Sequence, residues 1–214
     1  MNKIFAIGDI HGCLKKLEDL MALIAANPKR DKLVFIGDYI DRGNFSREVV
    51  NYIIGTKSKF KNVVCLLGNH EQMFLNYLEG MEEDLYLYNG GKYTLSDYDI
   101  QSSDPPDERK KKIPEAHLLF YRSLLPYHQT KDYIFAHAGL IPGVTLKKQA
   151  TQDLLWVRYE FIDSDYNFNR RVIFGHTPMS NPLIMENKIG IDTGAVYGGK
   201  LTCLELPEVK IYQV

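Results

Sequence analysis

Side chains that bind metal ions or transfer protons follow five short apolar runs of the chain. Each run is rich in β-branched and aromatic residues, and a polar motif begins where the run ends. In chain order the motifs are Gly8-Asp9-Ile10-His11-Gly12, Gly37-Asp38-Tyr39-Ile40-Asp41-Arg42-Gly43, Gly68-Asn69-His70-Glu71, His137-Ala138-Gly139 and Gly175-His176-Thr177-Pro178. Oxygen and imidazole donors without thiolate favour Mn²⁺, Fe or Zn²⁺ over a structural cysteine-type zinc, and leave Mg²⁺ open. The motifs therefore predict a metal site.

The number of candidate ligands in these motifs indicates how many ions the site holds. The candidates are Asp9, His11, Asp38, Asn69, His137 and His176. This set is too large for one metal ion that must keep an open position for a substrate. Two ions that share one bridging carboxylate fit it better, and pairs of ions roughly 3.5–4 Å apart serve phosphoryl hydrolysis. We therefore expect a dinuclear centre.

The apolar runs themselves have the composition of strands that are buried on both faces. The first three, Lys3–Ile7, Lys32–Ile36 and Asn62–Leu67, are separated by helical patterns and repeat at about thirty residues, the length of a βαβ crossover. Two more runs, Asp132–Ala136 and Arg171–Phe174, follow later. Ligands of open α/β sheets bind at the carboxyl ends of the strands, so we expect the five motifs to meet in one crevice.

The rest of the chain departs from this repeat. The polar segment 79–114 contains Gly90-Gly91 and Pro105-Pro106, and predicts an irregular excursion on the substrate side, followed by a short helix near Glu115–Leu124. The tail, Pro182–Val214, has short strand patterns separated by Gly, Asn and Pro, which predicts antiparallel hairpins. The 214 residues contain no linker, so we expect one domain over residues 1–214, of the α/β class.

Composition limits the partners and the location of the protein. The formal net charge is −1, which gives no general affinity for nucleic acid or for anionic membranes. No stretch approaches the roughly 20 apolar residues of a membrane-spanning helix. Cys13, Cys65 and Cys203 are odd in number and widely spaced, as expected for reduced thiols. We therefore expect a cytoplasmic protein that binds neither nucleic acid nor membrane; the sequence does not specify an oligomeric state.

In this order and spacing, the five motifs resemble those of the calcineurin-like metallophosphoesterases. Within that superfamily they are similar to the phosphoprotein phosphatases, and most of all to the short bacterial and phage Ser/Thr phosphatases such as lambda phosphatase. Symmetrical diadenosine tetraphosphatases share the same motifs. The resemblance extends from Gly8 to about Gly199 and implies a four-layer αββα sandwich, with parallel βαβ units at the N-terminus and antiparallel strands at the C-terminus.

The resemblance also implies a role for each matching residue. Asp9 and His11 would hold the first metal, Asp38 would bridge the two, and Asn69, His137 and His176 would complete the second site. His70 and Asp41 match the catalytic pair of the family; Arg42, Arg158 and Tyr197 match residues that bind the substrate. Asn89-Gly90-Gly91, followed by Thr94, is similar to a glycine pair near the substrate crevice of bacterial members. The implied cofactor is two divalent ions, Mn²⁺ first, with Fe or Zn²⁺ as alternatives.

These residues predict a hydrolytic mechanism. A water that bridges two metal ions becomes hydroxide-like near neutral pH and attacks phosphorus in line, without a phosphoenzyme intermediate. Arg42 and Arg158 would each grip phosphate oxygens through paired N–H groups. His70, kept protonated by Asp41, would donate a proton to the departing alkoxide.

The substrate remains a choice between alternatives at this point. The first hypothesis is a metal-dependent phosphatase acting on phosphoserine or phosphothreonine in proteins, because the chain is short. The alternative is a symmetrical diadenosine tetraphosphatase or another nucleotide-polyphosphate hydrolase; those symmetrical enzymes are typically longer, which leaves this chain less material for a dinucleotide pocket. A metal-binding scaffold without catalysis is disfavoured, because no ligand or catalytic residue of the pattern is missing. The expected partner is thus a phosphoprotein or a small phosphorylated substrate.

Overall fold

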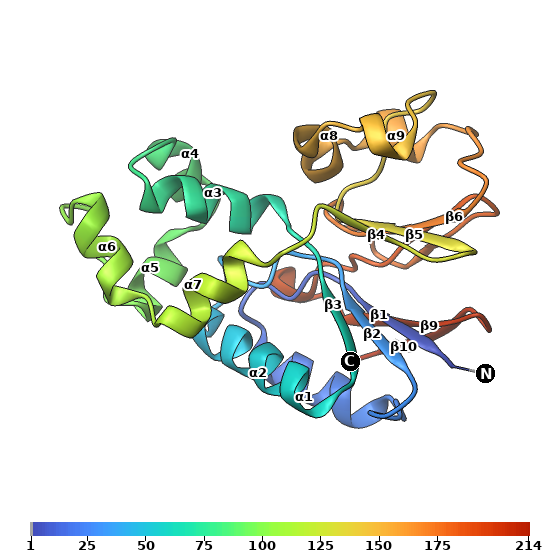
Figure 1. Cartoon of the computed structure of the whole chain (residues 1–214), viewed down its shortest axis with the longest axis horizontal. Coiled ribbons are helices and arrows are strands. Elements are labelled where there is room, and N and C mark those ends of the chain that lie inside the picture. Colours follow the sequence, from blue (N-terminus) through green and yellow to red (C-terminus); the bar gives the residue numbers. More distant parts are fainter. Residues whose placement is uncertain (1) are drawn as a thin grey trace.

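The computed structural model describes residues 2–214, in which two five-stranded sheets face each other between helices (Figure 1). The first sheet has the order β10-β9-β1-β2-β3. Its strands are β1 (Ile4–Ile7), β2 (Lys32–Phe35), β3 (Asn62–Cys65), β9 (Thr202–Leu206) and β10 (Lys210–Gln213). The second sheet has the order β4-β5-β6-β8-β7. Its strands are β4 (Tyr127–Gln129), β5 (Tyr133–Ala136), β6 (Arg171–Phe174), β7 (Leu183–Ile184) and β8 (Lys188–Gly190).

Helices cover the outer face of each sheet, which gives four layers. Helices α1 (Leu14–Leu23) and α2 (Ser46–Lys59) cover the first sheet. Helices α8 (Thr151–Trp156) and α9 (Tyr159–Ile162) cover the second, and η1 (Leu146–Lys148) precedes α8. The α/β class and the four-layer arrangement are confirmed. No helix within residues 2–214 is long and apolar enough to cross a membrane.

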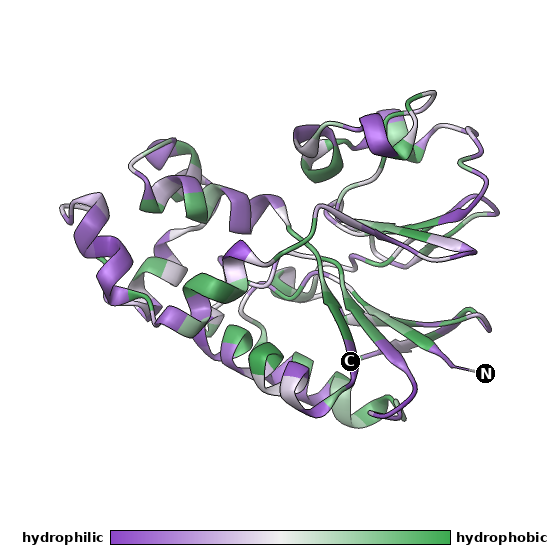
Figure 2. Ribbon diagram, in the orientation of Figure 1, coloured by the Kyte–Doolittle hydropathy of each residue, from purple (hydrophilic) through white to green (hydrophobic). Residues whose placement is uncertain are grey.

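Alternation along the strands explains why both faces of the sheets are apolar. In β1, Phe5 and Ile7 pack with the helices α1 and α2, whereas Ala6 packs between the two sheets. In β6, Ile173 lies in the core between the sheets and Phe174 packs against α8 and α9. Figure 2 shows the resulting concentration of apolar residues along the strands. Strands buried on both faces need continuous apolar runs, which is the pattern that the sequence has.

Both sheets mix parallel and antiparallel pairing; the second sheet is parallel in its middle and antiparallel at both edges, whereas the first is parallel from β1 to β3 and antiparallel from β1 to β10. β1 pairs with β2, and β2 with β3, in parallel. In the tail, β7 with β8 and β9 with β10 form the expected antiparallel hairpins. The hairpins belong to different sheets, however, because β9 pairs with β1 and β8 pairs with β6 in parallel. Strand β4 was not expected; it is three residues long and carries no clear pattern.

The segment 79–114, expected to be irregular, is helical instead. It contains α4 (Glu83–Tyr88), α5 (Lys92–Asp97) and α6 (Pro106–Lys112), which lie beside α3 (Asn69–Leu78) and α7 (Glu115–Arg122) at the side of the molecule where β1–β3 end (Figure 1). Helices of six or seven residues are too short to show a 3.6-residue period. They are stabilised by tertiary packing, because the rings of Tyr86 and Tyr98 pack against Phe74 of α3 and Leu95 is buried in the same core.

Candidate active site

The five motifs converge at the carboxyl ends of β1, β2, β3, β5 and β6, between the two sheets. All six predicted metal ligands lie there, and none is more than 5% exposed. These are Asp9, His11, Asp38, Asn69, His137 and His176. They follow strands of both sheets, so packing the two sheets against each other completes the cluster.

Asp38 occupies the middle of the cluster. Its Oδ2 lies 3.4 Å from Nε2 of His11, and its Oδ1 lies 3.4 Å from Nε2 of His137. Two groups of side chains could therefore each hold a metal ion, with Asp38 in both: His11, Asp38 and His70, and Asp38, His137 and His176. His70, predicted to be catalytic, thus lies in the first of these groups.

The side chain of Asn69 joins the second group. Its Oδ1 lies 3.0 Å from Nε2 of His137 and 2.9 Å from Nδ1 of His176. An amide oxygen and two imidazole nitrogens that point at one another suit a shared cation. Asp9 lies beside this group, and one of its oxygens accepts the backbone N–H of His176 at 3.0 Å.

Buried polar atoms without partners indicate that the cluster fits a cation. Within residues 2–214, Oδ1 of Asp9 and Nε2 of His176 are buried and have no hydrogen-bond partner. Burial and the nearby charge of Asp192 raise the pKa of Asp9 well above its usual range, and burial raises the pKa of Asp192 to about 6. Divalent cations would pair these lone pairs and offset the repulsion between the carboxylates. The donor set therefore fits the metal ions that the sequence predicted.

Strained backbone conformations aim several of these side chains. His11, Asp38, Asp41, Arg42 and His176 all have φ between 47° and 71°, the left-handed region that residues with a Cβ avoid. Such conformations persist only where the surroundings hold them. The backbone of Gly68 lies against the side chain of Asp38. A Cβ at Gly68 would be 2.2 Å from Oδ1 of Asp38, so only glycine permits this close approach.

Glu71 holds the loop that carries Asp38. Its two carboxylate oxygens accept four backbone N–H groups, those of Asp38, Tyr39, Ile40 and Gly68, at 2.8–3.3 Å. Burial and the charge of Asp38 raise the pKa of Glu71 to about 7. Glu71 therefore connects the start of α3 to the loop after β2.

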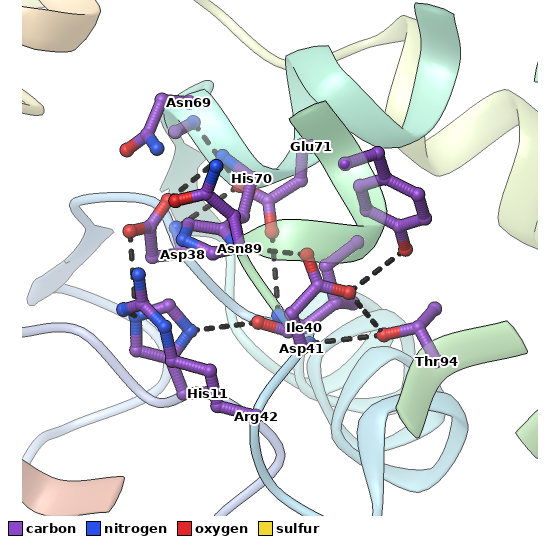
Figure 3. Close-up of polar contacts among 12 residues, drawn as sticks. His11, Asp38, Ile40, Asp41, Arg42, Asn69, His70, Glu71, Asn89 and Thr94 are labelled. Atoms are coloured by element: carbon purple, nitrogen blue, oxygen red, sulfur yellow. Dashed lines mark hydrogen bonds and ion pairs between the residues drawn. The ribbon is translucent and has the colours of Figure 1, made fainter. Parts of the chain in front are cut away.

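The predicted catalytic pair is formed in the structure. Nδ1 of His70 lies 2.7 Å from Oδ2 of Asp41, and both side chains are fully buried (Figure 3). Nε2 of His70 is buried and has no hydrogen-bond partner within the described part of the chain. It remains free to act on a ligand.

Of the three predicted substrate-binding residues, Arg42 and Tyr197 lie together beside His11, and Arg158 is exposed. Nη1 of Arg42 lies 2.8 Å from Nε2 of His11, and the guanidinium is 5.5 Å from the ring of Tyr197. Tyr197 lies in η2 (Ala195–Tyr197) and is 63% exposed. Arg158 is exposed and lies directly before α9. The pKa of His176 is lowered to about 2 by burial and by the charges of His137 and Arg158, among other causes. The charge of Arg158 thus acts on His176, whereas Arg42 contacts His11.

Four further residues contribute to the site without having been predicted. Glu71 and Asp192 lie in polar stretches that each follow an apolar run of the sequence. An acidic residue in the first turn of a helix or in a turn near a glycine usually caps the local backbone, so neither residue was singled out. Tyr86 and Thr94 contact Asp41 and come from the segment expected to be irregular. The only signal near them is the glycine pair that precedes Thr94.

Comparison with known proteins agrees with this fold. The family model described as calcineurin-like phosphoesterase matches residues 2–210. The chain belongs to this family of metallophosphoesterases. The protein is therefore a metal-dependent hydrolase of phosphoric esters, the broad class that the motifs predicted.

Curated relatives and solved structures give the likeness in more detail. The chain is 30% identical to the bis(5'-nucleosyl)-tetraphosphatase PrpE (asymmetrical) of Oceanobacillus iheyensis, over 99% of this chain and 92% of that protein. It is 29% identical to the PrpE of Bacillus cereus, over 97% and 92%. A structure provisionally assigned as a diadenosine tetraphosphatase matches with a TM-score of 0.76 and 22% identity, over 100% of this chain and 93% of that chain. A protein serine/threonine phosphatase from Saccharomyces cerevisiae matches with a TM-score of 0.63 and 17% identity, over 99% and 79%.

Proposed function

We propose that the protein hydrolyses a nucleoside polyphosphate, of the dinucleoside tetraphosphate type, at a dinuclear metal centre. The dinuclear centre is inferred from the position of Asp38, whose two carboxylate oxygens face His11 on one side and His137 on the other. The ions would be held by Asp9, His11, Asp38, Asn69, His137 and His176, with Mn²⁺ as the first choice and Fe or Zn²⁺ as alternatives. When bound, they would supply Lewis-acid chemistry for water and for phosphoryl oxygens.

The side chains around the centre act on the substrate. Arg42, beside His11, and Arg158 offer planar arrays of N–H donors that pair with phosphate oxygens. Tyr197, next to Arg42, offers an exposed ring to a base or to an aryl group. His70 holds one proton at Nδ1 against Asp41 and, when protonated, donates a second from Nε2 to the departing oxygen.

The choice of a dinucleotide rests on the relatives. Proteins named as asymmetrical tetraphosphatases match this chain over 92% of their own length, so a chain of this size has room for the activity in their name. The length of this chain therefore gives no reason to exclude a dinucleotide as the substrate. Because the relatives carry the asymmetrical designation, we expect water to attack a phosphorus that bears adenosine, so that diadenosine tetraphosphate yields ATP and AMP.

A phosphoprotein remains the second candidate, and one observation favours it. When a phosphoric anhydride is cleaved, the departing nucleoside phosphate is a weak base and needs little protonation. A departing serine or threonine alkoxide is a strong base and needs a proton donor. The buried pair His70 and Asp41 supplies such a donor. The same site therefore suits phosphoserine or phosphothreonine.

A parallel assay separates the candidates. The Mn²⁺-loaded protein is incubated with diadenosine tetraphosphate, a phosphothreonine peptide and 4-nitrophenyl phosphate, and the nucleotides are resolved by ion exchange. ATP with AMP supports the proposal, and two ADP would replace it with symmetrical cleavage. Turnover of the peptide without the dinucleotide would favour the second candidate, and turnover of none of the three would reject both.

Two variants test the assigned roles at the same site. Asp38→Asn removes the carboxylate that faces both groups, so metal content measured by elemental analysis falls for both ions. His70→Asn keeps the metal content and lowers kcat on a phosphothreonine peptide by about 10²–10⁴. Loss of metal in His70→Asn would instead make His70 a ligand, in line with its place beside His11 and Asp38.

A further inference from the structure

The carboxylate of Asp41 makes hydrogen bonds on both of its oxygens. Oδ2 faces Nδ1 of His70 at 2.7 Å. Oδ1 accepts the hydroxyl of Thr94 at 2.6 Å (Figure 3). The same oxygen accepts the hydroxyl of Tyr86 at 2.8 Å. All four side chains are buried from solvent. Protein groups must therefore supply every hydrogen bond that this carboxylate makes.

The direction of these hydrogen bonds follows from the groups involved. An ionised carboxylate only accepts, so both hydroxyls donate to it. Burial raises the pKa of Tyr86 well above its usual range, so its hydroxyl keeps the proton that it donates. Thr94 also accepts the backbone N–H of Asp41 at 2.9 Å, and thus holds the residue at its main chain and at its carboxylate.

We propose that Tyr86 and Thr94 are positioning residues, which orient the carboxylate of Asp41 so that it holds His70 with Nε2 directed at the departing oxygen of the substrate. This inference rests on the proton-donating role of His70 in the proposed function. The two hydroxyls act on His70 through Asp41.

The fold supports this role because both residues come from the helices α4 and α5, next to the loop of Arg42. The backbone N–H of Arg42 donates to the carbonyl of Gly90, between the two helices, at 3.3 Å. At Gly91 a Cβ would lie 2.4 Å from the ring of Tyr86, so glycine lets this ring reach Asp41. The segment 83–97 therefore supports the loop of residues 41 and 42 at three points.

Tyr77 offers a matched control for the loss of the Tyr86 hydroxyl. Its ring lies 5.1 Å from that of Tyr86 in the same buried cluster, and its hydroxyl has no hydrogen-bond partner within residues 2–214. Tyr86→Phe and Tyr77→Phe thus remove the same atom from neighbouring rings, and only the first removes a bond to Asp41. For Thr94, the pair Thr94→Val and Thr94→Ser separates loss of the hydroxyl from loss of the methyl group.

The first measurement uses no substrate and no metal. Histidine-selective ¹⁵N labelling reports the proton on Nδ1 of His70, assigned by its disappearance in His70→Asn. We expect a slowly exchanging Nδ1–H in the wild type, in Tyr77→Phe and in Thr94→Ser. In Tyr86→Phe and Thr94→Val its exchange with water should quicken by about tenfold or more. An unchanged exchange rate in both variants, in proteins that retain the wild-type melting temperature, would overturn the proposal.

The second measurement compares substrates with different leaving groups. Phenyl phosphate needs a proton donor more than 4-nitrophenyl phosphate does, because phenolate is the stronger base. Tyr86→Phe and Thr94→Val should lose about tenfold in kcat on phenyl phosphate and less than about twofold on 4-nitrophenyl phosphate. Equal losses of kcat on both substrates would show that Tyr86 and Thr94 have only a structural role. A wild type that hydrolyses neither substrate would defeat the proposed function, while the exchange measurement still decides the positioning of His70.

Discussion

The carboxylate of Glu71 accepts the backbone N–H of Asp38 at 3.0 Å, and this contact joins the third strand end to the second. The same carboxylate accepts three more N–H groups from the two loops. Asp38 has a φ of 52°, which is costly for any residue with a Cβ. Glu71 therefore maintains the strained loop on which the position of Asp38 depends.

Glu71→Gln should destabilise the protein and loosen the site. The amide retains one acceptor oxygen for four N–H groups, and its NH₂ is directed at donors. We expect the free energy of unfolding to fall by about 1–3 kcal/mol, as for buried hydrogen-bond groups that lose a partner. Urea unfolding measures the loss, and elemental analysis should show reduced metal content. Glu79→Gln is the control, because Glu79 pairs with Lys110 at the surface and should change stability by less than about 0.5 kcal/mol. Equal stability of the two variants would contradict the role of Glu71.

Lys16 should matter for substrate binding although it lies outside the motifs. From α1 its ammonium donates to the carbonyls of Ala195 and Gly199, on either side of Tyr197. Lys16→Met removes both charge-assisted bonds, each worth about 1.5–3 kcal/mol, and frees the loop that places Tyr197 beside Arg42. We expect KM to rise by about three- to tenfold with a smaller change in kcat.

Lys15→Met serves as the comparison for Lys16→Met. Lys15 is the preceding residue, is exposed, and pairs only with Asp19 among the described residues. Steady-state kinetics on 4-nitrophenyl phosphate should show wild-type values for this variant. If both variants gave the same KM, the loop would not depend on Lys16.

Asp31 should make stability depend on pH in the acidic range. Burial alone would raise its pKa, but the N–H groups of Asn27 and Lys3 and the charge of Arg30 outweigh burial, so the pKa lies below its ordinary value. The contribution of Asp31 is therefore complete above the unfolded pKa of about 3.9 and is lost as the pH falls through the folded pKa. Asp31→Asn should cost about 1–3 kcal/mol near pH 7 and less near pH 3. Urea unfolding at both pH values checks this, with the exposed Asp19→Asn as control; a cost independent of pH would refute it.

The thiols should resist reagents in the native protein. Burial raises the pKa of Cys65 to about 12, and it also raises the pKa of Cys203 and of the half-buried Cys13. Thiolate is the reactive form, so little is present near neutral pH. We expect dithionitrobenzoate to label at most Cys13, and slowly, before denaturant is added. After denaturant is added, labelling should rise to three thiols per chain. Fast labelling of two thiols in the folded protein would show that the core opens.

The strands and the meeting of the motifs were predictable because they rest on local patterns. Continuous apolar runs mark strands buried on both faces, and parallel strands in a sheet share one carboxyl edge. The predicted runs Lys3–Ile7, Lys32–Ile36 and Arg171–Phe174 became β1, β2 and β6, with bounds that differ by at most one residue from the prediction. By contrast, α4, α5 and α6 are short and are stabilised by contacts with α2 and α3, so no helical period in the sequence predicts them.

By itself the sequence determined the α/β class, the order of the strand-end motifs and the types of donor in each, because spacing and residue chemistry are properties of the chain. Only the tertiary structure decided which side chains meet. It placed Asp38 between histidines of two sheets, brought Glu71 under the Asp38 loop, and set Tyr86 and Thr94 against Asp41. The physical reason is that these contacts join residues about 30 to 100 positions apart, and their geometry exists only after the sheets and the helices of segment 83–97 have packed.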